Sequence, residues 1–134
     1  IIGYVLAPTL EAKYTIEALQ QAISHAGGGN LCGTIHHSDR GVQYCCDEYI
    51  TLLKEHHIRI SMTEDSNPTD NGMAERVNGI IKNEFLEPLQ TPKNLLEALP
   101  LVDHAVRTYN TLRPHLNLNM RTPAQVYEGK QIIL

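Results

Sequence analysis

The sequence predicts an α/β sandwich with a helical C-terminal tail. Short segments of strand character alternate with segments of helical period as far as residue 62, and only helical periods follow from residue 72. A length of 134 residues is typical of one domain with one core, so we expect a single domain over residues 1–134. The chain is 42% apolar but has no run near the roughly 18 apolar residues that a bilayer span needs. We therefore expect a soluble globular protein with no membrane partner.

Three segments have the composition of strands. Ile1–Ala7 is apolar and rich in β-branched residues, and a Pro-Thr pair ends it. Leu31–His37 ends at the turn signal Ser38–Gly41, and Ile58–Met62 alternates between polar and apolar residues. Three strands are few for such a sheet.

Two helices are predicted between these strands. The first has Thr9 as its N-terminal cap and Gly27 as its C-terminal stop, with a loop from Gly27 to Asn30. The second covers residues 44–57. Its apolar face is formed by Cys45, Tyr49, Leu52, Leu53 and His56.

The second half of the chain is predicted to be helical after a surface loop at Thr63–Asn71, which has almost nothing to bury. The helix that starts at Gly72 should bury Met73, Val77, Ile80, Ile81 and Phe85. Thr91-Pro92 opens a helix that Pro100 can kink, with an apolar seam of Leu95, Leu99, Val102, Val106 and Tyr109. Thr122-Pro123 opens a last helix that extends to about Tyr127.

Cysteine usage and charge narrow the class of protein. Three cysteines, two of them adjacent, make neither an even disulfide set nor a CxxC pair, which favours the reducing cytoplasm. The adjacent His36 and His37 point to opposite faces of a strand without a second ligand pair, so we do not expect zinc. The net charge of −4 argues against strong nonspecific attraction to nucleic acid, although basic residues outnumber acidic ones after Glu75.

Two carboxylates are candidates for a functional site. Asp39 follows a predicted strand, where ligand sites of open α/β sheets lie, but it could equally shape the turn to Gly41. Glu75, Gly79 and Lys82 should line one polar edge of a helix, which an ordinary solvated face explains as well. Thirty-five residues lie between Asp39 and Glu75, and the intervening helix and strand could bring both carboxylates to one cation.

Four ordered motifs give this pair a context. They are His37–Tyr44 (HSDRGVQY), Asp70–Glu75 (DNGMAE), Lys82–Glu84 (KNE) and Tyr109–His115 (YNTLRPH). Together they resemble the integrase-type (DDE) catalytic core of bacterial insertion-sequence transposases of the OrfB type, which are related to retroviral integrases. The resemblance covers essentially the whole chain. It implies a ribonuclease-H-like fold in which two Asp and one Glu bind two divalent metal ions for DNA cleavage and joining.

The resemblance assigns roles to the two carboxylates. Asp39 matches the second Asp of the family and Glu75 matches its Glu, so both are expected to be catalytic residues and metal ligands. Carboxylates suit hard ions, and the expected cofactor is Mg²⁺ or Mn²⁺. Two such ions can activate the attacking oxygen and stabilise the leaving oxygen at phosphorus.

The resemblance also indicates residues that contact DNA. Lys82, seven residues after the Glu, matches a basic position that lies against DNA near the cut. Asn71, Arg76 and Arg113 are further DNA-binding candidates. For Asn71 and the segment Arg113–His115, ordinary capping and turn chemistry is an equal alternative. The expected partners are transposon ends, target DNA and further copies of the chain.

One part of the family pattern is missing from this sequence. The family's first Asp lies upstream of a segment like Ile1–Ala7, yet no Asp precedes Asp39, and Glu11 and Glu17 belong to a predicted helix. We therefore expect an N-terminally truncated core that lacks the first two strands and retains three. Ile1–Ala7 would then pair with another strand, pair with a second molecule, or stay an exposed edge.

Two functions remain open at this point. In the first, the chain is part of a longer transposase that cleaves and transfers DNA strands, and it is inactive alone. In the second, it is a noncatalytic relic that acts only in DNA binding or self-association.

Overall fold

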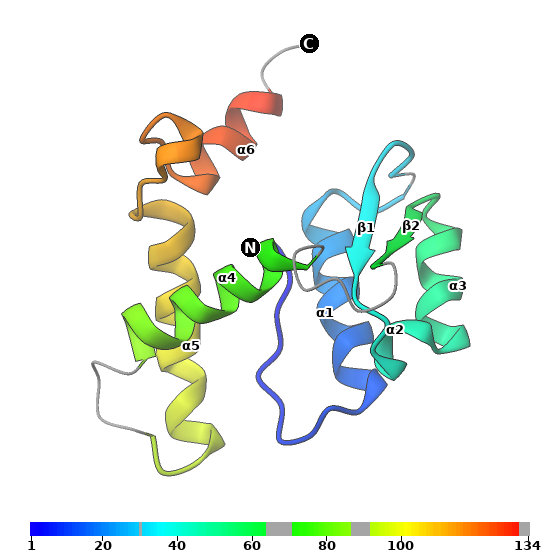
Figure 1. Ribbon diagram of the computed structural model, residues 1–134, viewed down its shortest axis with the longest axis horizontal. Coiled ribbons are helices and arrows are strands. Elements are labelled where there is room, and N and C mark those ends of the chain that lie inside the picture. Colours follow the sequence, from blue (N-terminus) through cyan, green and yellow to red (C-terminus); the bar gives the residue numbers. More distant parts are fainter. Residues whose placement is uncertain (30, 64–70, 87–91, 132–134) are drawn as a thin grey trace. The chain divides into compact units, whose positions relative to one another are not determined.

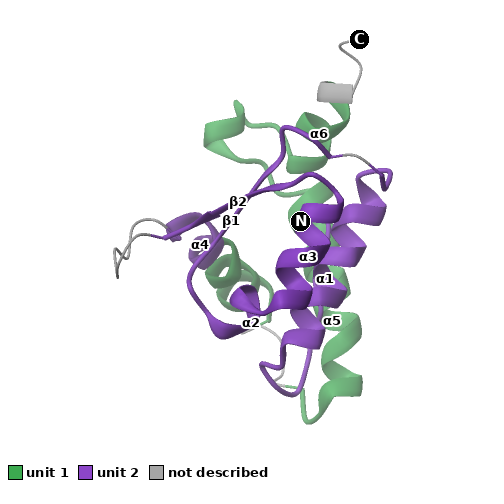
Figure 2. Cartoon of the chain, turned by 90° about the vertical axis from the view of Figure 1, so that its right-hand side faces the viewer, with its two compact units in different colours: residues 1, 77–134 green, residues 2–76 purple. Residues whose placement is uncertain are grey.

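The computed structural model describes residues 1–29, 31–63, 71–86 and 92–131. These residues form two compact units, one of residues 2–76 and one of residue 1 with residues 77–134 (Figure 2). The single domain over residues 1–134 stays a prediction. No helix within the described ranges is both long and apolar enough to cross a membrane.

The unit of residues 2–76 contains a two-stranded parallel sheet (Figure 1). Strand β1 (Ile35–Ser38) pairs in register with β2 (Arg59–Met62). The second strand lies almost where the alternation predicted it. The first is shorter than predicted at its start, because Gly33 adopts a φ of 92° and the Thr34 N–H donates to the Leu31 carbonyl oxygen in a turn.

Three helices accompany the sheet. They are α1 (Ala12–His25), α2 (Val42–Cys45) and α3 (Asp47–Glu55). The predicted helix over 44–57 is two helices, because Cys46 has an extended backbone with a ψ of 147°. The core of the unit consists of Ile16, Leu19, Ile23, Tyr49, Leu53 and Ile58. After β1 the chain passes through α2 and α3 before it enters β2. This helical connection lets β2 run beside β1 in the same direction, as parallel pairing requires.

The two ends of α1 differ in how well the sequence predicted them. Gly27, with a φ of 96°, donates its N–H to the Ser24 carbonyl, and Gly28 donates to the Ile23 carbonyl, which is a Schellman stop. At the start, the predicted Thr9 cap is wrong. Its hydroxyl donates to the Glu11 carboxylate instead, and Glu11 occupies the cap position without a side-chain bond to the helix.

The predicted strand at Ile1–Ala7 is also wrong. The segment has no ladder partner in the described sheet and follows α1 instead: the Tyr4 N–H donates to the Gln21 side chain at 3.3 Å. Gly3 approaches α1 so closely that a Cβ there would collide with the Ala18 carbonyl oxygen. An apolar segment can bury its side chains against a helix, whereas a strand needs a neighbouring backbone.

The second unit is helical. Helix α4 (Gly72–Ile80) spans the boundary between the units and continues directly into the π-helix η1 (Ile81–Leu86). Then follow α5 (Leu95–Thr111), the 3-10 helix η2 (Leu116–Leu118) and α6 (Pro123–Gln131). The buried side chains in this unit include Ala105, Val106, Tyr109 and Thr122.

The helix starts of this unit show one correction and one confirmation. The helix predicted from Thr91-Pro92 starts at Leu95, capped by Asn94, whose Oδ1 accepts from the Glu97 N–H at 3.0 Å. Thr91 lies outside the described residues. The predicted Thr122-Pro123 start is confirmed, because the Gln125 N–H donates to the Thr122 hydroxyl at 3.3 Å. That helix extends beyond Tyr127 to Gln131.

The predicted buried faces of α4 and α5 are only partly present. Met73 is 84% exposed, so its predicted burial is wrong, while Val77 and Ile80 are half-buried. Along α5, burial concentrates at Ala105, Val106 and Tyr109, and Leu95 and Leu99 at the other end stay exposed. The helix is continuous through Pro100.

Candidate functional site

Asp39 lies directly after β1, at the carboxyl end of the parallel pair. Its side chain is half-buried, and Oδ1 accepts the Gly41 N–H at 2.8 Å. A Cβ at Gly41 would approach that oxygen to 2.9 Å, so the turn favours glycine. The turn-shaping bond that the sequence allowed is therefore present. It uses one carboxylate oxygen and leaves Oδ2 without a hydrogen-bond donor among the described residues.

Glu75 lies in the first turn of α4, where a carboxylate interacts favourably with the positive end of the helix dipole. Its backbone N–H donates to the Asn71 carbonyl oxygen at 3.2 Å, so Asn71 precedes the helix and its carbonyl starts the hydrogen-bond pattern. Glu75 is exposed and has no ion-pair partner in the described part of the chain. Within the unit of residues 2–76, both views draw this first turn near the ends of β1 and β2 (Figures 1 and 2).

Arg40 joins the ends of the two strands. Its Nε donates to the Thr63 carbonyl at 2.9 Å, and the Thr63 N–H donates to the Ser38 carbonyl at 3.0 Å. Ser38 and Thr63 are buried, and the Ser38 hydroxyl has no partner among the described residues. This role of Arg40 was not predicted from the sequence. Its only signal was its place beside Asp39 in the first motif.

An aromatic cluster joins β1 to α3: Tyr49 is buried, and His36 and Tyr44 are half-buried. The Tyr49 hydroxyl and His36 Nε2 lie 2.8 Å apart, and the rings of Tyr44 and Tyr49 meet edge to face at 5.6 Å. Burial lowers the pKa of His36 and raises the pKa of Tyr49 to about 12. Both groups therefore stay neutral at pH 7. They hold β1, the strand that Asp39 follows, against α3.

The basic candidates have different environments. Arg76 and Lys82 are exposed, and Lys82 lies in the π-helix η1 rather than in a regular α-helix. Glu75 belongs to one unit and Lys82 to the other, so the shared polar edge of Glu75, Gly79 and Lys82 stays a prediction.

Arg113 makes a bidentate ion pair. Its Nε and Nη2 donate to the two carboxylate oxygens of Glu84, both at 2.7 Å. The hydrogen bond to Arg113 holds the pKa of Glu84 below its ordinary value. Sequence reasoning missed this partnership. Both residues belong to the four motifs, which was the only available signal.

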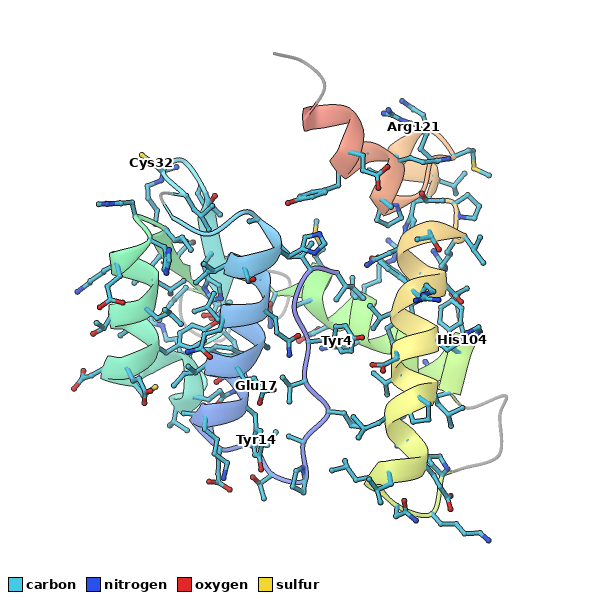
Figure 3. The ribbon with its side chains drawn as sticks, turned by 180° about the vertical axis from the view of Figure 1, so that it is seen from behind. Tyr4, Tyr14, Glu17, Cys32, His104 and Arg121 are labelled. Carbon is cyan, nitrogen blue, oxygen red and sulfur yellow. The ribbon has the colours of Figure 1, made fainter. Side chains whose placement is uncertain are left out.

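The donor set agrees in part with a divalent metal ion. Asp39 and Glu75 supply carboxylate oxygens, which are the ligands that Mg²⁺ and Mn²⁺ prefer. In the ranges that the structure describes, no group of three or more His, Cys, Asp or Glu side chains could hold a metal. Cys32 and Cys45 are exposed, and Cys32 lies at the outside of the turn before β1 (Figure 3). Two carboxylates can hold one ion weakly, but they do not complete a two-metal site.

Comparisons with known proteins show which proteins the chain resembles. Residues 56–123 match the family model described as Integrase core domain. The chain is 31% identical over 125 residues to the transposase for insertion sequence element IS629 of Shigella sonnei, an alignment that covers 93% of this chain and 41% of that protein. The chain spans less than half of the length of the curated relatives that it matches.

Solved structures show the same likeness. The HTLV-2 integrase catalytic core domain in complex with magnesium superposes with a TM-score of 0.62 at 28% identity, covering 87% of this chain and 69% of that chain. The catalytic core domain of BIV integrase has a TM-score of 0.68 at 21% identity, covering 95% and 77%, and indicates the fold alone. The mixed helix and strand fold thus resembles integrase catalytic cores, as the motifs implied. Two strands, rather than the three predicted, are present in its described part.

Proposed function

This chain belongs to the integrase core domain family, and from that membership we propose that it acts in DNA transposition as part of a longer transposase. The proposed reaction is metal-dependent cleavage and transfer of DNA strands. Asp39 and Glu75 are its catalytic carboxylates.

One observation carries this proposal. Asp39 follows β1 and Glu75 opens α4, and both belong to the compact unit of residues 2–76. Of the Asp39 carboxylate, Oδ1 is held by the Gly41 N–H, which fixes the group and leaves Oδ2 for a ligand. The exposed Glu75 side chain can turn toward the same ion.

The cofactor proposed for this pair is Mg²⁺ or Mn²⁺. When bound, such an ion supplies charge stabilisation at phosphorus and activation of the attacking oxygen. Asp39 and Glu75 hold the ion. Arg40 keeps the end of β2 against the end of β1 through the Thr63 carbonyl, and so maintains the strand ends from which Asp39 projects.

DNA is the proposed partner. Lys82 and Arg76 are exposed cations that can neutralise phosphates, and Asn71 lies at the turn before α4. Self-association is proposed as well, although Ile1–Ala7 forms no strand and so offers no strand edge for a second copy.

Within residues 1–134, the proposed set of two Asp and one Glu is incomplete. No Asp precedes Asp39 within residues 1–134, so these residues hold two of the three proposed carboxylates. These residues alone should therefore not transfer DNA strands. The same observation favours a second candidate, a noncatalytic module that keeps DNA contact or self-association without binding a catalytic metal.

Calorimetry with Mn²⁺ tests the metal assignment. We expect the chain to bind Mn²⁺ with measurable heat, and Asp39→Asn and Glu75→Gln each to abolish most of it. Glu55→Gln, an exposed carboxylate at the end of α3, serves as the matched control and should bind like the unchanged chain. Equal heats for all four proteins would remove the metal assignment and favour the noncatalytic module.

A further inference from the structure

The π-helix η1 contains the proposed DNA contact Lys82 and the ion-paired Glu84. A π-helix is rare: it occurs mostly as a single turn inside or beside an α-helix, frequently at functional sites. An α-helical register would present the side chains after Ile80 in different directions. The direction of Lys82 therefore depends on whatever holds η1 in its π form.

Arg113 has the geometry to supply that restraint. Its backbone N–H and that of Leu112 both donate to the Thr108 carbonyl, at 3.0 and 2.9 Å, which anchors Arg113 to the end of α5. Its guanidinium donates hydrogen bonds to both carboxylate oxygens of Glu84, which is 29 residues earlier in the chain. A bidentate pair fixes orientation as well as distance.

The side chain of Arg113 is only 27% exposed, against 46% for Glu84. Its guanidinium faces Glu84, and Nε and Nη2 both donate to that carboxylate. This environment suits a structural restraint better than a phosphate ligand, which would have to break the pair first.

We propose that Arg113 is a positioning residue, which holds η1 through Glu84 and thereby sets the direction in which Lys82 meets DNA. The inference rests on the proposed function only for the DNA that Lys82 binds. The restraint on η1 belongs to this chain by itself and can be measured without DNA.

Hydrogen exchange tests the restraint. In Glu84→Gln and Arg113→Lys, amides of residues 81–86 should exchange several-fold faster, while α1 and α3 stay unchanged. Arg113→Lys keeps the positive charge and loses the bidentate geometry, so it separates geometry from charge. Glu128→Gln on α6 is the charge-matched control for Glu84→Gln. Unchanged exchange at residues 81–86 in both variants would overturn the proposal.

Binding to a DNA duplex at several salt concentrations tests the consequence for Lys82. Lys82→Ala should lower the salt slope by roughly 0.9, which corresponds to one phosphate contact on a duplex. Glu84→Gln should lower the salt slope by a similar amount. The variant with both substitutions should have a salt slope no lower than that of either single variant. If Arg113 is instead a phosphate ligand, Glu84→Gln releases it, and binding tightens with a steeper slope; that result contradicts the proposal. A chain that binds no duplex at any salt contradicts the proposed function, and hydrogen exchange still decides the restraint.

Discussion

At the scale of single residues, the candidate site is supported by neutral buried groups behind β1. Tyr49 is 4% exposed, and its hydroxyl lies 2.8 Å from His36 Nε2. His36 Nδ1 is buried without a partner among the described residues, so the bond to Tyr49 is important for this ring. Losing the bond to Tyr49 would leave His36 Nε2 without a partner as well.

We expect Tyr49→Phe to lower the free energy of unfolding by about 1–2 kcal/mol, because His36 loses its partner. The pKa of Tyr49 is raised from its ordinary 10 to about 12, so the neutral hydroxyl stabilises the fold below pH 10, and this contribution is lost as the pH rises toward 12. Urea denaturation at pH 7 and at pH 11 measures both effects. Tyr14→Phe is the control, and equal losses in the two variants at pH 7 would contradict the account.

The ion pair of Glu84 gives a pH dependence of opposite sense. Arg113 lowers the pKa of this carboxyl, so the pair stabilises the fold above the ordinary value of 4.5, and the contribution is lost as the pH falls through the lowered pKa. Because Glu84 is 46% exposed, solvent screening keeps the effect below about 1 kcal/mol. The free energies of unfolding of the chain and of Glu84→Gln should differ at pH 7 and converge as the pH falls below the lowered pKa of Glu84. A difference that grows on acidification would refute the assignment.

At the scale of elements, local signals predicted what local chemistry decides. The Gly27 stop, the alternating β2 and the Thr122-Pro123 start each depend on residues within one turn or one strand, and the structure contains them. The strand predicted at Ile1–Ala7 was wrong because pairing depends on a partner that composition does not reveal. The pair of Glu84 and Arg113 could not be predicted, since 29 residues separate its members.

The cap of α5 offers a prediction at this scale. Asn94 accepts the Glu97 N–H, and the Glu97 carboxylate accepts the Lys93 N–H at 2.9 Å, which makes a reciprocal cap. Asn94→Ala should lower the free energy of unfolding by about 1 kcal/mol, whereas Asn94→Asp keeps an acceptor and should be nearly neutral. Urea denaturation of both variants checks this. Equal stability of the alanine variant and the unchanged chain would show that the cap is unimportant.

At the scale of the whole molecule, the chain combines a small parallel sheet unit with a helical unit and belongs to the integrase core domain family. The motifs predicted the family and the order of the candidate residues. They could not establish the separation of Asp39 and Glu75, because that distance depends on a path through two helices and a strand. The role of this pair as one metal site is the central proposal.

Broadening of backbone NMR signals by Mn²⁺ tests the shared metal site of Asp39 and Glu75 most directly, because a bound paramagnetic ion weakens the signals of nearby amides. At a small fraction of one equivalent, we predict that amides of residues 39–41 and 74–76 lose intensity together, while those around Glu55 keep theirs. Asp39→Asn should protect both segments at once. Loss at only one segment, or losses that Asp39→Asn leaves unchanged at residues 74–76, would contradict a shared metal site.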